Sequence, residues 1–248
     1  GVIESPANVG YTGPLEVGLD LTATLGIVKY EAPTPQDLNA RGPYGHGIPK
    51  TDEERVQSLE SVPYGELVDV TTKIDGQSFT AFVKKRDDGT WEEGVGGRSF
   101  LYKADSQNHF TRNAAKLDVF AKLRAFCAER GLNGLAVRGE QYGQGIQKGK
   151  HNPHSLLPVG VMLFSTWLMD ERRYATKGHP LYIHTIAPLM GLPTVPVIEK
   201  DVVLTPELVK RYSEELEKVN GQAFEGVVVN HAAGSFKVIN LHYDQKKG

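Results

Sequence analysis

The sequence VTTKIDGQSF, Val70 to Phe79, has the pattern of a β-strand that runs into a turn and places a lysine at the end of the strand. Side chains alternate between the two faces of an extended chain, so Lys73 and Asp75 share one face. Gly76 lets the backbone turn and allows a ligand to approach closely. A lysine partly removed from water has a lowered pKa and can act as a neutral amine nucleophile. The alternative is a hydrated turn whose lysine reaches solvent, because this short pattern occurs by chance in about one chain in twenty of this length.

Three later stretches also place single charges beside apolar strands. RGEQYGQGIQ places Glu140 at the end of an apolar strand, before a glycine-rich loop. FEGVVV places Glu225 at the head of another apolar strand, and GSFKVIN places Lys237 between apolar residues. Charges beside apolar strands are costly unless they are paired or bound to a ligand. The four stretches together therefore favour a chemical site over four accidents.

Composition sets wider limits on the class of protein. The 248 residues allow one large domain or two small ones, and 40% hydrophobic with 23% charged residues is typical of a globular protein. A formal net charge of −2 excludes a bulk polycation but leaves a local basic groove open. No apolar run approaches the ~20 residues that span a bilayer and no signal peptide is present, so we expect an intracellular protein with no membrane partner. Cys127 is the only cysteine, so no intrachain disulfide can form, and a small buried apolar role is expected for it rather than a reactive thiol.

The pattern of apolar residues predicts an α+β protein. Helices are expected at residues 53–61, 113–130 and 205–219, the second ended by a glycine and the third opened by a threonine cap and a proline. Residues 40–49 are expected to form a loop. Strands are expected at residues 21–30, 66–73, 78–85, 135–139, 159–167, 226–230 and 235–241.

In this order the four stretches resemble motifs of the covalent nucleotidyltransferase superfamily, which includes ATP-dependent DNA ligases, RNA ligases and RNA capping guanylyltransferases. Lys73–Gly76 resembles motif I, Glu140 motif III, Glu225 with the following glycine motif IV, and Lys237 motif V. The stretches KTDEERVQ, GQGIQ and FKVIN are similar to those of nick-sealing, ATP-dependent RNA ligases. The resemblance covers about residues 50–240.

The resemblance implies a fold of two antiparallel β-layers flanked by helices, with a nucleotide-binding groove between them, as in the adenylyltransferase core that is described as ATP-grasp-like. It implies one nucleotidyltransferase domain over residues 1–248, in which 1–50 form a loop-rich lead-in. An OB-like module is expected upstream, outside this chain. We also expect a monomer.

The resemblance further implies a three-step reaction. Lys73 attacks the α-phosphate of ATP to form lysyl-AMP, AMP passes to the 5′-phosphate of nicked RNA, and a 3′-hydroxyl then displaces AMP. Phosphoryl transfer depends on placement and charge neutralisation, so Mg²⁺ or Mn²⁺ is expected as the metal.

Site roles follow from the same resemblance. Asp75 is expected to orient the 3′-hydroxyl or hold a metal-bound water, and Glu225 to meet metal-bound water. Glu140 is expected to bind the ribose hydroxyls, with a structural ion pair to Arg138 or a neighbour as the alternative. Arg98 is expected to bind phosphate through two N–H donors of its planar guanidinium group.

Two residues beside the motifs complete the expected nucleotide site. Thr72 precedes the nucleophile, and Arg55 lies in the helix expected upstream of it. A hydrated helix charge is the alternative for Arg55.

An aromatic side chain is expected to stack on the adenine. By register Trp167 is the first choice and Phe164 the second. The two are an odd number of residues apart, so at most one faces the groove in a regular strand. The acidic residue that usually follows this aromatic is Leu168 here.

The largest departure from the family pattern lies at motif V. Many relatives carry a second lysine where this chain has Ile239, so Lys237 must contact the α-phosphate alone or with another cation such as Lys246, Lys247 or Lys148. Lys148 and Lys150 form a small basic loop that we expect to contact the nucleic-acid backbone. His151 and His154 have metal-ligand spacing, but no third ligand accompanies them, and we reject a zinc site.

Other functions remain as alternatives. A DNA ligase or a capping-type guanylyltransferase would use the same motifs. A noncatalytic domain that binds nucleotide or RNA ends, or a structural module, would not form a covalent adenylate.

Overall fold

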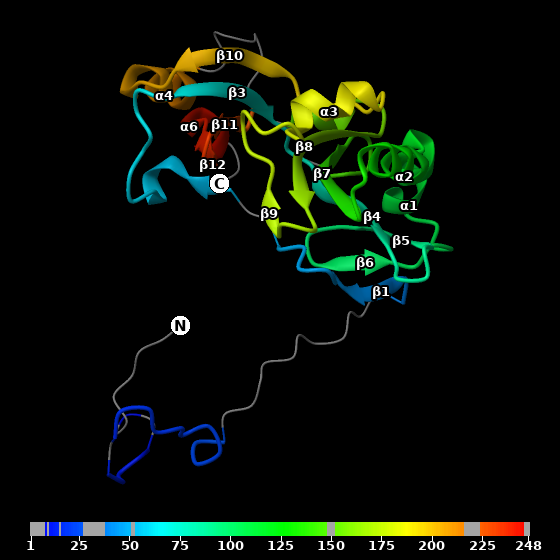
Figure 1. Cartoon of the computed structure of the whole chain (residues 1–248). Helices are drawn as coiled ribbons and strands as arrows, with labels where there is room; N and C mark the ends of the chain where they lie inside the picture. Colours follow the sequence, from blue (N-terminus) through cyan, green and yellow to red (C-terminus); the bar gives the residue numbers. More distant parts are fainter. Residues whose placement is uncertain are drawn as a thin grey trace. The chain divides into compact units, whose positions relative to one another are not determined.

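Two β-sheets adjoin at the VTTKIDGQSF stretch. Strand β3 (Leu67–Lys73) belongs to a five-stranded sheet and strand β4 (Gln77–Lys85) to a seven-stranded sheet. The three residues between them form the turn that passes from one sheet to the other (Figure 1). Lys73, the last residue of β3, therefore stands where the two sheets meet.

The computed structural model describes residues 8, 10–14, 16–26, 38–50, 53–147, 152–215 and 224–245. The chain divides into two units, Gly1–Pro35 and Gln36–Gly248. In the first unit, residues 22–26 form turns, so the strand expected at 21–30 is wrong there, and residues 27–30 lie outside the described part. Everything below concerns the second unit.

In the seven-stranded sheet every neighbouring pair of strands is antiparallel. The order is β1-β6-β5-β4-β7-β8-β9. Besides β4, its strands are β1 (Ala40–Pro43), β5 (Trp91–Gly96), β6 (Phe100–Tyr102), β7 (Gly134–Tyr142), β8 (Gly160–Leu168) and β9 (Arg173–Tyr174).

The five-stranded sheet has the order β10-β3-β11-β12-β2. Its pairs are antiparallel except β12 with β2, which is parallel. Besides β3, its strands are β2 (Glu54–Arg55), β10 (Val197–Val203), β11 (Gly226–His231) and β12 (Gly234–Ile239). Gly226 has a φ of +155°, and a Cβ there would lie 2.2 Å from the Val238 carbonyl oxygen, so this strand start requires glycine.

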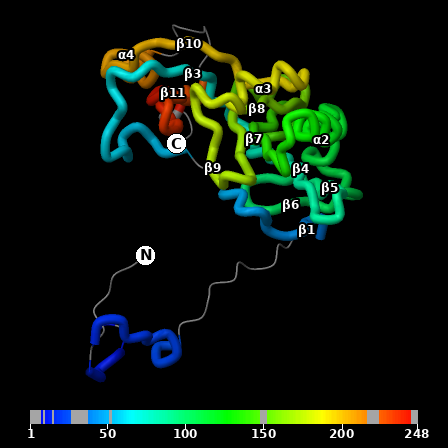
Figure 2. The backbone as a smooth tube through the Cα atoms, viewed as in Figure 1, coloured from blue at the N-terminus to red at the C-terminus, as the bar shows by residue number. Residues whose placement is uncertain are grey.

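Helices cover one face of each sheet (Figures 1 and 2). The seven-stranded sheet packs against α1 (His109–Leu117), α2 (Val119–Arg130) and α3 (Ile183–Leu189). The five-stranded sheet packs against α4 (Pro206–Glu214), and α6 (Leu241–Gln245) lies beside α4. Two short 3₁₀ turns, η2 (Val56–Ser58) and η3 (Pro153–Leu156), complete the described elements. The α+β fold with two β-layers is confirmed.

Some expected elements differ in extent or type. The helix expected at 113–130 is two helices, because Asp118 adopts a left-handed φ of 51° between them. Asn108 caps α1 by accepting hydrogen bonds from two backbone amides, which starts the helix earlier than expected. The expected end of α2 at Gly131 is confirmed. The third helix begins as expected after Thr205, and residues 216–219 lie outside the described part.

Two expectations near the lead-in are wrong. The helix expected at 53–61 is a two-residue strand followed by a 3₁₀ turn, because β2 pairs with β12 far along the chain. The loop expected at 40–49 begins with β1, which pairs with β6. Both differences come from pairing with distant strands, which local sequence patterns do not report.

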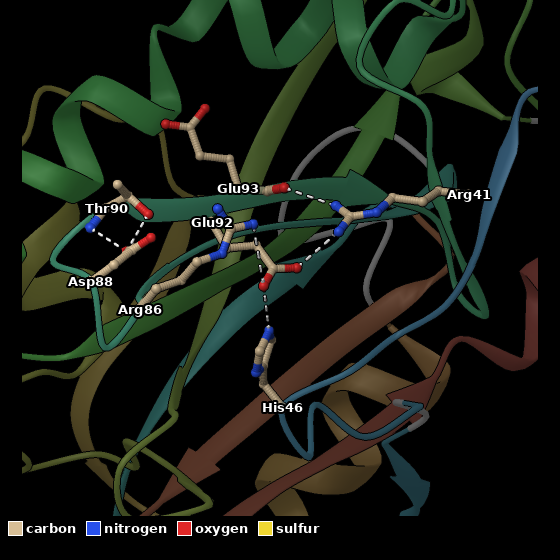
Figure 3. Close-up of polar contacts among 7 residues, drawn as sticks. All are labelled: Arg41, His46, Arg86, Asp88, Thr90, Glu92 and Glu93. Carbon is tan, nitrogen blue, oxygen red and sulfur yellow. Dashed lines mark hydrogen bonds and ion pairs between the residues drawn. The ribbon is translucent and has the colours of Figure 1, made fainter.

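A polar cluster attaches the segment after β1 to the seven-stranded sheet (Figure 3). Glu92 on β5 accepts a hydrogen bond from Arg41 Nη2 at 2.9 Å and contacts His46 Nε2 at 3.2 Å. Arg41 Nη1 also donates to the Glu93 carbonyl oxygen at 3.2 Å, and Arg86 Nη2 lies 3.9 Å from Glu92. These contacts attach Arg41 and His46 to the seven-stranded sheet.

Two smaller expectations also have an outcome. Cys127 is fully buried among apolar side chains, and burial raises the pKa of its thiol to about 12, which confirms the packing role. Among the described residues, no helix combines the length and apolar character needed to cross a bilayer.

Candidate active site

A lysine–glutamate pair lies at the junction of the sheets. Lys73 Nζ donates to Glu225 Oε2 at 2.7 Å, with side chains 22% and 18% exposed. Lys73 is paired in register with Gly226, so the residue before Gly226 is brought beside the lysine. Two of the four sequence motifs therefore meet by strand pairing.

A cavity of about 440 Å³ opens beside this pair. The seven-stranded sheet contributes Glu140 and Phe164 to its walls, and the turn between β5 and β6 contributes Arg98. Gly76 fits tightly at its edge, since a Cβ there would lie 2.3 Å from the Gln141 carbonyl oxygen and 2.9 Å from Glu140 Cγ. The structure thus brings the lysine of motif I, Glu140 and Arg98 around one space, and Glu225 contacts that lysine.

Charge pairing sets the protonation of Lys73. Burial alone lowers the pKa of Lys73, but the charge of Glu225 and its hydrogen bond outweigh burial, and Glu140 and Glu53 add to the effect. The pKa of the lysine therefore lies above its ordinary value. The expectation that burial lowers the pKa of this lysine is wrong for the nucleotide-free protein, because Glu225, Glu140 and Glu53 lie close to the amine and raise its pKa.

Glu140 is shifted in the direction that neutralises it. Burial raises the pKa of Glu140 from its ordinary 4.5 to about 8, although Lys73 acts in the opposite direction. The carboxylates of Glu225, Glu53 and Asp75 add to the rise. The empty site thus favours a charged Lys73 beside a neutral Glu140.

Arg138 does not pair with Glu140. It is fully buried on β7, and its Nη1 donates to the Pro49 carbonyl oxygen at 2.6 Å and to Tyr174 Oη at 2.8 Å. The ion pair considered as the alternative role of Glu140 is absent from the described part of the chain.

Phe164 and Val228 face a narrow slot between the sheets. Both line a cavity of about 50 Å³ that Lys73 and Glu140 also border. Phe164 is a bulge residue, since Arg138 pairs with Ser165 while the next residue of β7 pairs with Leu163. A bulge re-aims a side chain, and here the ring turns into the groove.

Trp167 does not line this cavity. It is 7% exposed in a cluster with Phe82 and Ala136, and its ring packs edge-on against Tyr174 at 4.9 Å. It lines none of the three cavities described for this site. The placement favours Phe164 over Trp167 as the side chain that meets a base.

Lys237 and Arg55 are neighbours on the edge of the five-stranded sheet. They are paired in the parallel β12–β2 register, and Lys237 is also paired with Val228. Paired residues share a face, so both cations lie on the face of Val228 that borders the groove. Arg55 reaches this place through a strand and not through the expected helix.

Thr72 is placed differently from its neighbour. It pairs with Val227, which packs in the core under α4, so alternation puts its side chain on the face opposite Lys73. Its backbone borders the 50 Å³ cavity, and its amide donates to the Pro196 carbonyl oxygen at 3.0 Å.

Two residues that the sequence did not indicate fix Asp75. Tyr243 on α6 is 1% exposed and donates its hydroxyl to Asp75 Oδ2 at 2.5 Å. Asn152 Nδ2 donates to the Asp75 carbonyl oxygen at 2.8 Å. Burial and this carboxylate raise the pKa of the Tyr243 hydroxyl, so it stays a donor.

Glu53 is the other residue that the sequence did not indicate. It borders the 440 Å³ and 50 Å³ cavities and an adjoining one of about 450 Å³. It lies in the stretch KTDEERVQ, but the resemblance of that stretch assigns no role to Glu53 itself. Lys148, Lys150, His151, Lys246 and Lys247 lie outside the described residues, so the basic-loop and second-cation expectations stay predictions.

The donor set suits a hard divalent cation held partly by substrate. Carboxylate oxygens dominate around Lys73, and among the described residues no three His, Cys, Asp or Glu side chains form a ready metal cluster. Mg²⁺ is commonly held by one or two carboxylates, waters and substrate phosphates. The residues present fit that mode of binding.

Two β-sheets with a lysine at their junction, ringed by carboxylates and cations, define a nucleotidyltransferase fold. The family model described as RNA ligase matches residues 66–240, and the chain belongs to that family. No curated protein matches the sequence.

Solved structures of the Naegleria gruberi RNA ligase are similar to this chain. A mutant with ATP and Mn is 28% identical, with a TM-score of 0.66 over 92% of this chain and 67% of that one. The ligase with pyrophosphate gives 28% identity and a TM-score of 0.65 over 93% and 68%. A mutant with AMP and Mn gives 28% identity and a TM-score of 0.66 over 94% and 68%.

Proposed function

We propose that this chain is the nucleotidyltransferase domain of an ATP-dependent RNA ligase that works through a lysyl-AMP at Lys73. The observation that supports this most is the 2.7 Å pair of Lys73 Nζ with Glu225 Oε2, beside a cavity that Arg98 and Glu140 also line. Membership of the RNA ligase family and likeness to ligase structures with ATP or AMP and Mn support the same reaction.

The proposed reaction has three steps. Lys73 Nζ attacks the α-phosphorus of ATP, an N–P bond forms, the bond to the β-phosphate oxygen breaks, and pyrophosphate leaves. An oxygen of an RNA 5′-phosphate then attacks the same phosphorus, and the N–P bond breaks. Finally the 3′-hydroxyl attacks the 5′-phosphate phosphorus, loses its proton, and releases AMP as the nick is sealed.

The first step requires that Lys73 lose a proton, and Glu225 opposes that loss in the nucleotide-free protein. Mg²⁺ or Mn²⁺, held by Glu225 and through water by Asp75, would offset the carboxylate and phosphate charge and so favour the neutral amine. Glu225 is the nearest base for the departing proton.

The remaining groups bind and orient ATP. The base fits between Phe164 and Val228, and Glu140 meets the ribose hydroxyls. Lys237 and Arg55 contact phosphate from the five-stranded sheet, and Arg98 contacts it from across the cavity.

Covalent labelling tests the proposal. Incubation with α-labelled ATP and a divalent metal, followed by a denaturing gel, should label the protein. Lys73→Arg should abolish the label because guanidinium is not a nucleophile at neutral pH. Lys84→Arg is the matched control, since Lys84 pairs with Asp170 at 3.0 Å on the other sheet, and it should keep the label.

The alternatives give different results in the same assays. Label from GTP alone would identify a capping-type enzyme, and sealing of nicked DNA in preference to nicked RNA would identify a DNA ligase. Reversible ATP binding with no covalent label would identify a noncatalytic domain. Full labelling of the Lys73→Arg variant would place the nucleophile elsewhere.

A further inference from the structure

The segment that runs from the turn after β5 through α1 carries an excess of positive charge. Residues 98–117 contain four Lys and Arg residues and one acidic residue, whereas the whole chain has 28 basic and 30 acidic ones. Lys103, Arg112 and Lys116 are exposed. We call these three residues the α1 rim.

The α1 rim is fixed at the edge of the catalytic cavity. Phe110, in the first turn of α1, lines the 440 Å³ cavity together with Arg98, and Figure 1 shows α1 beside β5. Asn113 on the inner side of α1 donates to Gln141 Oε1 at 3.1 Å, and Gln141 Nε2 reaches Gln77 Oε1 at 2.7 Å. Gln77 begins β4, four residues after Lys73, so α1 lies across the strand ends that border the nucleophile.

The charges of the α1 rim are not neutralised within the part of the chain that the structure describes. Lys103 Nζ donates to the Leu38 carbonyl oxygen at 2.9 Å, and Lys116 Nζ to the Val159 carbonyl oxygen at 3.3 Å. Arg112 and Lys116 are four residues apart on one helical face, where like charges destabilise a helix. Exposed cations with no acidic partner in the described part of the chain, on a protein of net charge −2, fit a ligand with spaced negative charges.

We propose that the α1 rim binds the phosphate backbone of the RNA substrate and leads its 5′-phosphate end toward Lys73. The inference rests on the proposed function, because the RNA end must enter the same cavity that α1 borders. An RNA backbone carries a charge at each nucleotide, and lysine and arginine contacts to it bind without reading sequence.

The test uses a double variant, Arg112→Gln with Lys116→Gln, and a nicked RNA duplex with a 5′-phosphate. Without ATP, the dissociation constant should rise about tenfold at ~0.1 M salt, and the slope of log K against log salt should shrink by about 1.5. Self-adenylylation by ATP alone should stay at the wild-type rate, since neither residue touches the nucleotide.

The control is the double variant Lys85→Gln with Arg86→Gln, which also removes one lysine charge and one arginine charge. Both residues are exposed at the far end of β4, eight and nine residues and about 30 Å from Gln77. RNA affinity and salt slope should match the wild type.

The outcomes separate the two proposals. The α1 rim would be overturned as an RNA site if the Arg112→Gln, Lys116→Gln variant kept the wild-type RNA affinity and salt slope. It would also be overturned if the control double variant weakened RNA binding equally. Loss of affinity only in the α1 double variant would support it, whether or not the protein forms a covalent adenylate. Absence of the adenylate in the wild type would contradict the proposed function alone.

Discussion

Replacing Glu140 by glutamine should make the empty protein more stable at alkaline pH. The pKa of Glu140 is about 8 in the folded protein and near its ordinary 4.5 when unfolded. Below pH 4.5 the folded and unfolded states both hold the proton, so the ionisation of Glu140 does not change the free energy of unfolding. Between 4.5 and 8 only the folded state holds it, so the free energy of unfolding falls as pH rises.

The size of the effect follows from the same two values. The gap between 4.5 and about 8 corresponds to at most about 5 kcal/mol, at roughly 1.4 kcal/mol per pKa unit. Water entering the groove reduces this, so we expect Glu140→Gln to gain about 2 kcal/mol at pH 8. For a chain of this size that raises Tm by about 4–8 °C. At pH 5 the gain should be below about 1 kcal/mol.

The measurement is urea or thermal unfolding of both proteins at pH 5, 6.5 and 8, without nucleotide or metal. The difference in the free energy of unfolding between variant and wild type reports on Glu140 alone, because the histidines are the same in both proteins and cancel. Glu92→Gln is the control of opposite sign: burial raises the pKa of Glu92, but His46 and Arg41 outweigh it and hold that pKa below its ordinary value. Glu92→Gln should therefore lose stability at neutral pH. A Glu140→Gln gain that is the same at pH 5 and pH 8, or absent at pH 8, would refute the reasoning.

Phe164→Ala should raise KM for ATP by about 10–100-fold, because stacking on a base contributes about 1–3 kcal/mol. Trp167→Phe should instead lower Tm and leave KM for ATP within about twofold of the wild-type value. The reverse result in adenylylation kinetics would restore Trp167 as the stacking residue. Lys237→Ala should slow adenylylation about 100-fold, as loss of a donor to developing phosphate charge does, whereas Lys210→Ala, on exposed α4, should not. A Lys237→Ala rate within about threefold of wild type would mean that another cation contacts the α-phosphate.

The sequence predicted the parts of the site that depend on local strand patterns. Lys73, Glu140 and Glu225 each stand at the end or head of an apolar strand, and those strands meet in the structure. Strand ends that carry charge beside glycine are visible in a sequence because both features are local.

What the sequence did not predict depends on distant pairing. Arg55 lies in a strand because its partner Lys237 is far along the chain. Phe164 turns into the groove because of a bulge that alternation cannot reveal. Tyr243 bonds Asp75 only because α6 packs back toward the junction of the sheets.

The crossing of the chain from β3 to β4 fixes where the nucleophile stands during any rotation of one sheet against the other. A point near a rotation axis travels less than points farther away, and Lys73 ends the strand at that crossing. Spreading of the walls at Phe164 and Val228 to admit ATP or release pyrophosphate would thus displace those walls further than the amine. The groove could change its width while Lys73 Nζ moves less than the walls.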